Sequence, residues 1–134
     1  MSGSGASPGG STLVATDRVL FITRHGKEIL LIDVSNCSAD QVEKVFRSVP
    51  DLVTTRPPAS VLAFTDFTGA TFNREAIRVI KETAVFNKPY VKKSACVGKE
   101  SLPFEFPENV ISFSNRRFSA FNTREEALEW LTKD

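Results

Sequence analysis

Two carboxylates follow apolar runs that are typical of buried strands. Asp33 ends the run "EILLID" and Asp66 ends "VLAFTD". In an open α/β sheet such residues lie at the carboxyl edge, where ligands usually bind. Paired carboxylates there could act as general acid and base, or short polar side chains could satisfy loop amides. The second interpretation is favoured, because the chain has no G-x-S-x-G motif, no phosphate loop and no metal-spaced His/Cys set.

Three further side chains could line the same rim as the two aspartates: Ser35, Thr68 and Cys96. Cys37 and Cys96 are the only cysteines of the chain. Two thiols in a chain that is not secreted are more often small buried hydrophobes than a disulfide or a metal site. We therefore expect no catalytic residue, metal or cofactor.

The connection "TDFTGATFN" offers a possible regulatory site. It could bind phosphate, carry a phosphorylatable hydroxyl on Thr68 or Thr71, or only reverse the chain. We interpret it first as a strand-to-helix connection, with a turn at Gly69 and a helix N-cap at Asn73. Phosphate on Thr71 would lie near a helix N-terminus, where exposed amides favour anions.

We interpret the remaining charged residues and the single histidine as solvated surface residues. His25, the only histidine, stands beside Gly26 in a predicted turn and lacks the cleft and orienting partner that a general base needs. Six basic residues could gather around the fourth predicted strand: Lys88, Lys92, Lys93, Lys99, Arg116 and Arg117. The net charge of +1 nevertheless argues against nucleic acid as a partner.

The segment "LPFEFP" places Phe104 and Phe106 between prolines. These rings could plug the core, form a lid over an apolar pocket, or form a self-association patch that makes a homodimer. The sequence leaves these alternatives open.

The composition is that of one globular domain: 134 residues, 41% hydrophobic and 25% charged. Residues 1–15 are predicted to be a flexible Gly/Ser-rich segment, and residues 16–134 are predicted to form the domain. The N-terminal segment does not have the pattern of a signal peptide, and no apolar run is long enough to span a bilayer. We expect a cytoplasmic location and no integral membrane segment.

The first predicted elements are a hairpin and a helix. The stretch "RVLFITRHGKEILLIDV" has strand composition on both sides of the His25-Gly26 turn. A helix should follow, because Ser38 and Gln41 have capping-box spacing. Its apolar stripe consists of Val42, Val45, Phe46 and Val49.

The later predicted elements alternate between strand and helix. A strand over "SVLAFTDF" precedes a helix capped by Asn73, and "YVKKSACVG" predicts a fourth strand. We expect a short helix over 108–115, a fifth strand over 117–121 and a final helix with a second capping box at Thr123 and Glu126. The fold class is therefore α/β, with a single mixed sheet of about five strands and about four helices. The N-terminal strand is antiparallel and the remainder are parallel.

Four motifs in order and spacing carry a resemblance to a known family: "GKEILLIDVSN", "VLAFTDFTGATFNREAI", "KPYVKKSACVG" and "FNTREEALEWL". Together they resemble the SpoIIAA-like branch of the STAS-domain proteins, over residues 19–131. The resemblance implies a small sheet with helices, related in shape to lipid-binding CRAL-TRIO domains.

The resemblance also implies a function. The better-known STAS proteins are anti-sigma-factor antagonists that a kinase phosphorylates in an Asp-Ser-Ser-Gly-like motif between the third strand and second helix. Here Asp66, Thr68, Gly69 and Thr71 are present without the contiguous motif. We expect a non-enzymatic regulatory module that binds a protein partner and is modulated by phosphorylation. The alternative is a carrier or sensor of a small apolar, lipid-like ligand.

Overall fold

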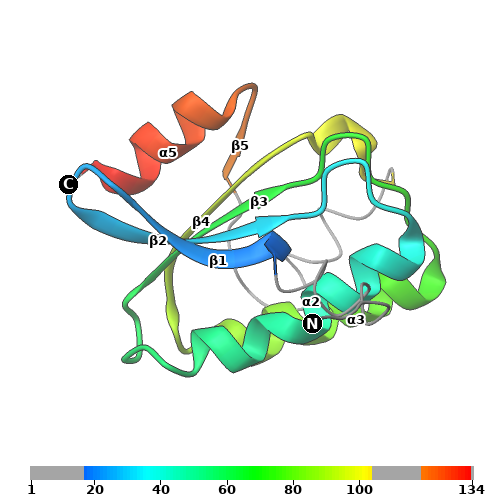
Figure 1. Cartoon of the computed structure of the whole chain (residues 1–134), viewed down its shortest axis with the longest axis horizontal. Helices are drawn as coiled ribbons and strands as arrows, with labels where there is room; N and C mark the ends of the chain where they lie inside the picture. Colours follow the sequence, from blue (N-terminus) through cyan, green and yellow to red (C-terminus); the bar gives the residue numbers. More distant parts are fainter. Residues whose placement is uncertain (1–16, 104–118, 134) are drawn as a thin grey trace, which may run out of the picture.

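The computed structural model describes residues 17–103 and 119–133, which form one mixed five-stranded sheet (Figure 1). The strands lie in sequence order: β1 (Val19–Arg24), β2 (Lys27–Asp33), β3 (Val61–Asp66), β4 (Val91–Val97) and β5 (Ser119–Phe121). β1 pairs antiparallel with β2, and all the other pairs are parallel. The predicted fold class is confirmed.

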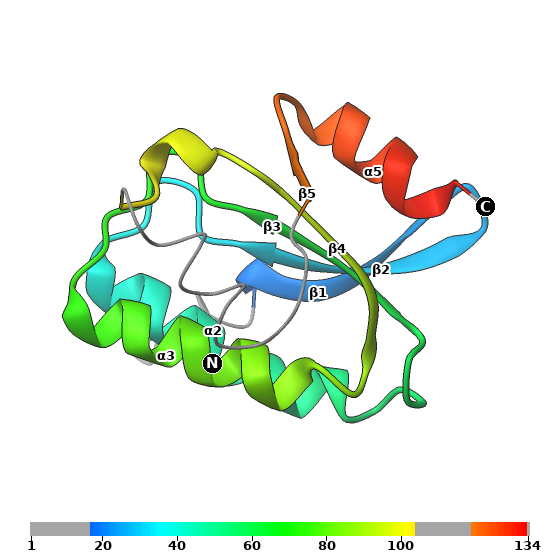
Figure 2. The same ribbon diagram turned by 180° about the vertical axis from the view of Figure 1, so that it is seen from behind.

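The helices cover both faces of the sheet. The α-helices of the described ranges are α2 (Ala39–Val53), α3 (Arg74–Asn87) and α5 (Arg124–Thr132), with a short 3₁₀ turn, η1 (Lys99–Ser101). α2 and α3 lie side by side on one face, and α5 lies on the other (Figures 1 and 2). The expected helix over 108–115 falls outside the described residues, as do Phe104, Phe106 and the segment 1–15.

The hairpin prediction is confirmed, and its turn explains the His-Gly pair. His25 and Gly26 both have positive φ, 55° and 75°, as a two-residue type I′ turn requires. Arg24 pairs with Lys27 directly across it. Glycine is useful at the second position because it takes this conformation without steric cost.

Helix α2 begins as predicted but contains a proline. The capping box is complete: the Gln41 amide donates to Ser38 Oγ (3.3 Å), and the Ser38 amide donates to Gln41 Oε1 (2.9 Å). Pro50 lies inside the helix and cannot donate to the Phe46 carbonyl. The buried hydroxyl of Thr83 on α3 donates to that carbonyl instead, at 3.5 Å.

The caps of the other helices are mostly as predicted. Asn73 Oδ1 accepts the Ala76 amide at 2.8 Å. In α5, Thr123 Oγ1 accepts the Glu126 amide at 3.1 Å, but the Glu126 carboxylate accepts the Asn122 amide. The second capping box is therefore shifted by one residue on its acidic side.

The core has two layers because β3 is buried along its whole length. The layer under α2 and α3 contains Leu30, Ala63 and Phe67, together with the four predicted apolar residues of α2. The layer under α5 contains Phe64 and Leu128. Side chains alternate between the faces of a strand, so these two layers fix which face each polar residue at the strand ends occupies.

Candidate site at the carboxyl edge of the sheet

The structure brings the two predicted aspartates side by side at the carboxyl edge of the sheet. Asp33 and Asp66 are register partners at the ends of β2 and β3. Asp66 and Phe64 are two residues apart in β3 and therefore point to the same face of the sheet, so the Asp66 carboxylate projects to the α5 face. It is buried, with 6% of its surface exposed.

Arg124, the first residue of α5, joins the two carboxylates. Its Nη2 lies 2.8 Å from Asp66 Oδ2 and 3.3 Å from Asp33 Oδ2, and its Nε donates to Asp66 Oδ2 at 2.9 Å. A second cation, Arg18, lies 3.8 Å from Asp33 Oδ1 and donates to the Ser35 carbonyl at 3.0 Å. Two arginines thus balance two aspartates, and we call these four residues the Asp–Arg cluster.

The carboxylates also hold the loops that follow their strands. Asp33 Oδ1 accepts the amide and the hydroxyl of Ser35, at 2.9 and 2.6 Å. Asp66 Oδ1 accepts the Thr68 amide at 2.9 Å. This is the arrangement of the favoured interpretation, in which short polar side chains satisfy loop amides.

The surroundings of Asp33 keep it ionised. Burial by itself raises the pKa of this carboxyl, but the hydrogen bonds from Ser35 and the charges of Arg124 and Arg18 outweigh burial. The pKa of Asp33 therefore lies below its ordinary value. General acid catalysis near neutral pH needs a raised pKa instead, so Asp33 is poorly suited to that role.

The connections after β2, β3 and β4 meet beside the Asp–Arg cluster. The Asn36 amide donates to the Thr68 carbonyl (2.8 Å), and the Gly69 amide donates to Ser101 Oγ (2.9 Å). Gly69 has φ +71°, and a Cβ there would lie 2.2 Å from Asn36 Oδ1. Thr68 is exposed on this fixed turn.

Thr71 lies at the far end of the same connection. Its side chain is exposed, while its amide donates to the Cys37 carbonyl at 2.9 Å. Thr68 and Thr71 therefore both reach solvent from a backbone that neighbouring loops hold in place.

Cys96 does not join this edge, contrary to the prediction. It packs in the layer under α2 and α3 and is 4% exposed, on the opposite face from the aspartates. Burial raises its pKa to about 11, and burial also raises the pKa of Cys37. The expectation that both thiols are buried is confirmed.

Sequence reasoning missed both arginines of the Asp–Arg cluster. One signal was present: Arg124 occupies the first turn of a helix, where the helix dipole favours acidic residues and disfavours cations. A cation in that position indicates a partner outside the helix. Arg18 carries no comparable signal.

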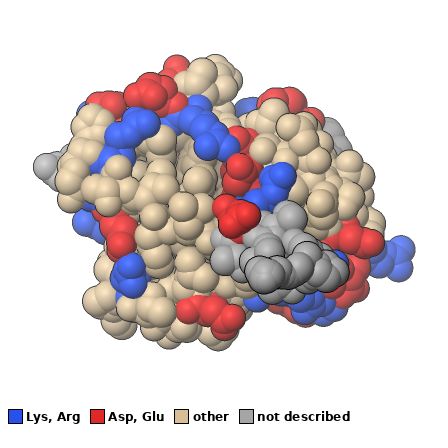
Figure 3. Space-filling model, in the orientation of Figure 1, with Lys and Arg blue, Asp and Glu red and all other residues tan. Residues whose placement is uncertain are grey.

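Among residues 17–103 and 119–133, the predicted basic residues do not form one patch. Lys88, Lys92 and Lys99 are exposed, but Lys93 Nζ donates to the carbonyls of Trp130 (3.3 Å) and Lys133 (2.9 Å). Arg116 and Arg117 are outside the described ranges. On the face in Figure 3, basic and acidic side chains are interspersed.

His25 has an exposed side chain whose Nε2 lies 3.7 Å from Glu129 Oε1. Within residues 17–103 and 119–133, no three His, Cys, Asp or Glu side chains gather closely enough to hold a metal ion. The helices of this part of the chain are also too short or too polar to cross a membrane.

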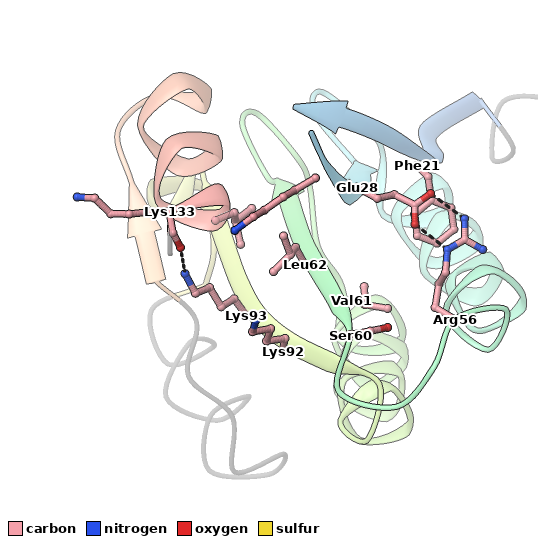
Figure 4. A pocket seen from close by; sticks show the side chains of 11 residues that line it. Phe21, Glu28, Arg56, Ser60, Val61, Leu62, Lys92, Lys93 and Lys133 are labelled. Atoms are coloured by element: carbon pink, nitrogen blue, oxygen red, sulfur yellow. Dashed lines mark hydrogen bonds and ion pairs between the residues drawn. The ribbon is translucent and has the colours of Figure 1, made fainter. Parts of the chain in front are cut away.

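Hollows lie at both edges of the sheet on the surface of the described residues. One, of about 320 Å³, lies beside the carboxyl edge and is lined by Lys99, Ala120, Phe121, Asn122 and Glu126. The other, of about 350 Å³, lies at the opposite edge, where β3 and β4 begin (Figure 4). Charged side chains line both.

Comparison with known proteins identifies the fold. No family model and no curated protein matches the chain. A solved structure does match: an uncharacterized protein from the DUF3478 family of Shewanella loihica PV-4, described as having a SpoIIAA-like fold. The similarity has a TM-score of 0.62 at 14% sequence identity, over 84% of this chain and 91% of that one. At this identity the match shows the fold alone, and this chain has a SpoIIAA-like fold.

Proposed function

We propose that the protein is a non-enzymatic interaction module whose β3–α3 connection binds a protein partner, with binding modulated by phosphorylation of Thr68 or Thr71. The observation that carries the proposal is the contrast between these threonines and their neighbours. Both threonines are exposed on a fixed backbone, while the adjacent Asp33 and Asp66 are occupied by arginines. Recognition is therefore assigned to the hydroxyls rather than to the carboxylates.

The backbone of the connection supports recognition by a partner. Because Asn36 and Ser101 hold Thr68 and Gly69 from two sides, a partner would lose little conformational entropy when it binds this turn. A phosphoryl group would add about −1.5 to −2 charges there at neutral pH. Lys99 follows Gly98, whose backbone packs against Thr68, and it supplies a cation nearby.

Phosphorylation is tested by incubating the protein with Ser/Thr kinases and ATP, followed by intact mass and peptide mapping. Modification should map to Thr68 or Thr71, and Thr68→Val or Thr71→Val should remove it. Thr54→Val is the matched control, because Thr54 is also exposed but lies at the end of α2. Phosphate on Thr54 alone, or no mass gain with any kinase, would contradict the modulation.

Partner binding is tested by placing a photo-crosslinking amino acid at position 68 or 54 and irradiating cells of the native host. Position 68 should give one discrete adduct that mass spectrometry identifies, and position 54 should not. The partner protein identified in that adduct should then bind the purified protein, and its affinity should fall when Thr68 is replaced by Glu. The same adduct from both positions would show that the connection is not the interface.

Two checks bear on the other functions. With esterase and phosphatase substrates, we expect no turnover that depends on Asp66. Turnover by the wild type that is lost in Asp66→Asn would indicate an enzyme. Native mass spectrometry of freshly purified protein tests the carrier of a small apolar ligand. Lysine side chains line both hollows described above, so neither favours an uncharged apolar ligand.

A further inference from the structure

The hollow at the amino edge of the sheet concentrates positive charge. Its lining contains four lysines and one arginine against one glutamate, a formal net charge of +4 in a chain whose total is +1, and one of the lysines, Lys27, already has an interaction partner. The eleven lining residues are Phe21, Lys27, Glu28, Arg56, Ser60, Val61, Leu62, Lys92, Lys93, Leu131 and Lys133. This edge is opposite to the one that carries Thr68, so the two regions are independent.

One wall of the hollow is fixed by a bidentate ion pair between Arg56 and Glu28. Arg56 donates through Nε and Nη2 to both carboxylate oxygens of Glu28, at 2.7 and 2.8 Å. Its guanidinium also lies 3.9 Å from the centre of the Phe21 ring. Arg56 and Glu28 neutralise each other, so the positive charge available to a ligand comes from Lys92 and Lys93, which lie together in the hollow (Figure 4).

Lys93 is held in place at the opposite side. Its ammonium donates to the carbonyls of Trp130 and Lys133 and lies 5.0 Å from the centre of the Trp130 ring. The two carbonyls take two of its three N–H groups. A positioned ammonium of this kind can donate to a ligand without first losing side-chain entropy.

An irregularity in the sheet brings a second lysine into the same hollow. Consecutive strand residues ordinarily point to opposite faces, yet Lys92 and Lys93 both line it. The register between β3 and β4 shifts at this point: Val61 pairs with Val91, whereas Leu62 pairs with Lys93. Such irregularities re-aim side chains and are common beside functional sites.

The floor between the lysines is apolar. Val61, Leu62 and Leu131 contribute to the lining, while Lys92 at its margin is exposed. The volume of about 350 Å³ falls at the small end of the range for small-molecule sites. An apolar floor with cations at its margin suits a molecule that has an apolar body and an anionic group.

We propose that this hollow binds a small organic anion, an aryl or acyl carboxylate or phosphate. The anionic group contacts the ammonium groups of Lys92 and Lys93, and the apolar body covers Leu62 and Leu131. This inference goes beyond the partner-binding function proposed above and does not depend on it.

The test is an NMR titration of backbone amides with naphthoate, compared with neutral naphthalenemethanol and with inorganic phosphate. Shift changes should be confined to the residues that line the hollow. Naphthoate should bind about tenfold more tightly than either comparison compound and more weakly at high salt. Lys92→Glu should weaken naphthoate binding about fivefold, since a favourable charge becomes unfavourable.

The matched control is Lys44→Glu, which makes the same change of net charge at an exposed position on α2. It should alter the affinity less than about twofold. Equal losses in both variants, shift changes elsewhere, or equal affinity for naphthalenemethanol or phosphate would overturn the proposal. If Lys92→Glu does not fold, Lys92→Gln with Lys44→Gln as its control gives the corresponding comparison.

Discussion

Arg124 Nη2 lies 2.8 Å from Asp66 Oδ2, although the two residues are 58 positions apart in the chain. This contact fastens the first turn of α5 to the end of β3, and the 3.3 Å contact with Asp33 extends it to β2. Helix α5 has only nine residues, too few to be stable in isolation. The Asp–Arg cluster therefore helps to determine where the helix docks.

We expect Arg124→Ala to lower the free energy of unfolding by about 1–3 kcal/mol. Loss of a partner from a fully buried pair costs about 3–5 kcal/mol, and the Arg124 side chain is 45% exposed. Arg124→Lys should recover only part of the loss, because an ammonium cannot bridge two carboxylates with a planar fork. Urea unfolding measures both, and equal stability of the wild type and the alanine variant would contradict this role.

The contribution of Asp33 to stability should depend on pH. Its pKa is lowered in the folded state, so the stabilisation is fully present above the unfolded pKa of about 3.9 and is lost as the pH falls through the folded value. The stability difference between wild type and Asp33→Asn should be constant near neutrality and should shrink below about pH 4. Unfolding curves at a series of pH values measure it. In the Arg124→Ala background this change should be smaller, and a difference that grows in acid would refute the argument.

Gly98 and Gly26 form a natural pair for testing the packing of the β4 loop. Both have positive φ, 79° and 75°. A Cβ on Gly98 would lie 2.3 Å from the Thr68 nitrogen, whereas one on Gly26 would meet nothing within 4 Å. Gly26→Ala should cost about 1–2 kcal/mol of backbone strain, and Gly98→Ala should cost about 1–3 kcal/mol more. Thermal unfolding compares them, and equal losses would show that the contact with Thr68 does not matter.

Neither cysteine should react with a thiol reagent while the protein is folded. Both thiols are buried, and with a pKa of about 11 only about one Cys96 in a thousand is ionised at pH 8. Absorbance with a disulfide reagent should show no fast reaction in buffer and two reactive thiols in urea. Fast native labelling of Cys96 would contradict its placement under α2 and α3.

Much of the fold could be predicted because its signals are local. The turn at His25-Gly26, the capping box of Ser38 and Gln41, and the stripe from Val42 to Val49 each depend on neighbours within a few residues. The sequence pattern predicts that Ile77, Ile80 and Ala84 form the buried face of α3, and this is correct only in part. Ile80 and Ala84 are buried, but Ile77 is only partly buried, while Ala76 and Val79 are buried, because the packing of α3 against α2 decides which side of the helix is covered.

The candidate site was only partly predictable. Asp33, Ser35 and Asp66 were placed correctly at one edge, because the carboxyl ends of adjacent parallel strands meet there. Cys96 was misplaced because the strand pattern alone did not show to which face its side chain points. Arg18 and Arg124 were missed because each acts on carboxylates that are distant in sequence.

Local patterns along the chain were enough to predict the elements, their order and the mixed sheet, since periodicity, caps and turns act over a few residues. The pairing of Arg124 with both Asp33 and Asp66, and the shared hollow of Lys92 and Lys93 across a shifted register, became visible only in three dimensions. Charge pairing and sheet register depend on distances in space between segments that lie far apart along the chain, so no local pattern reports them.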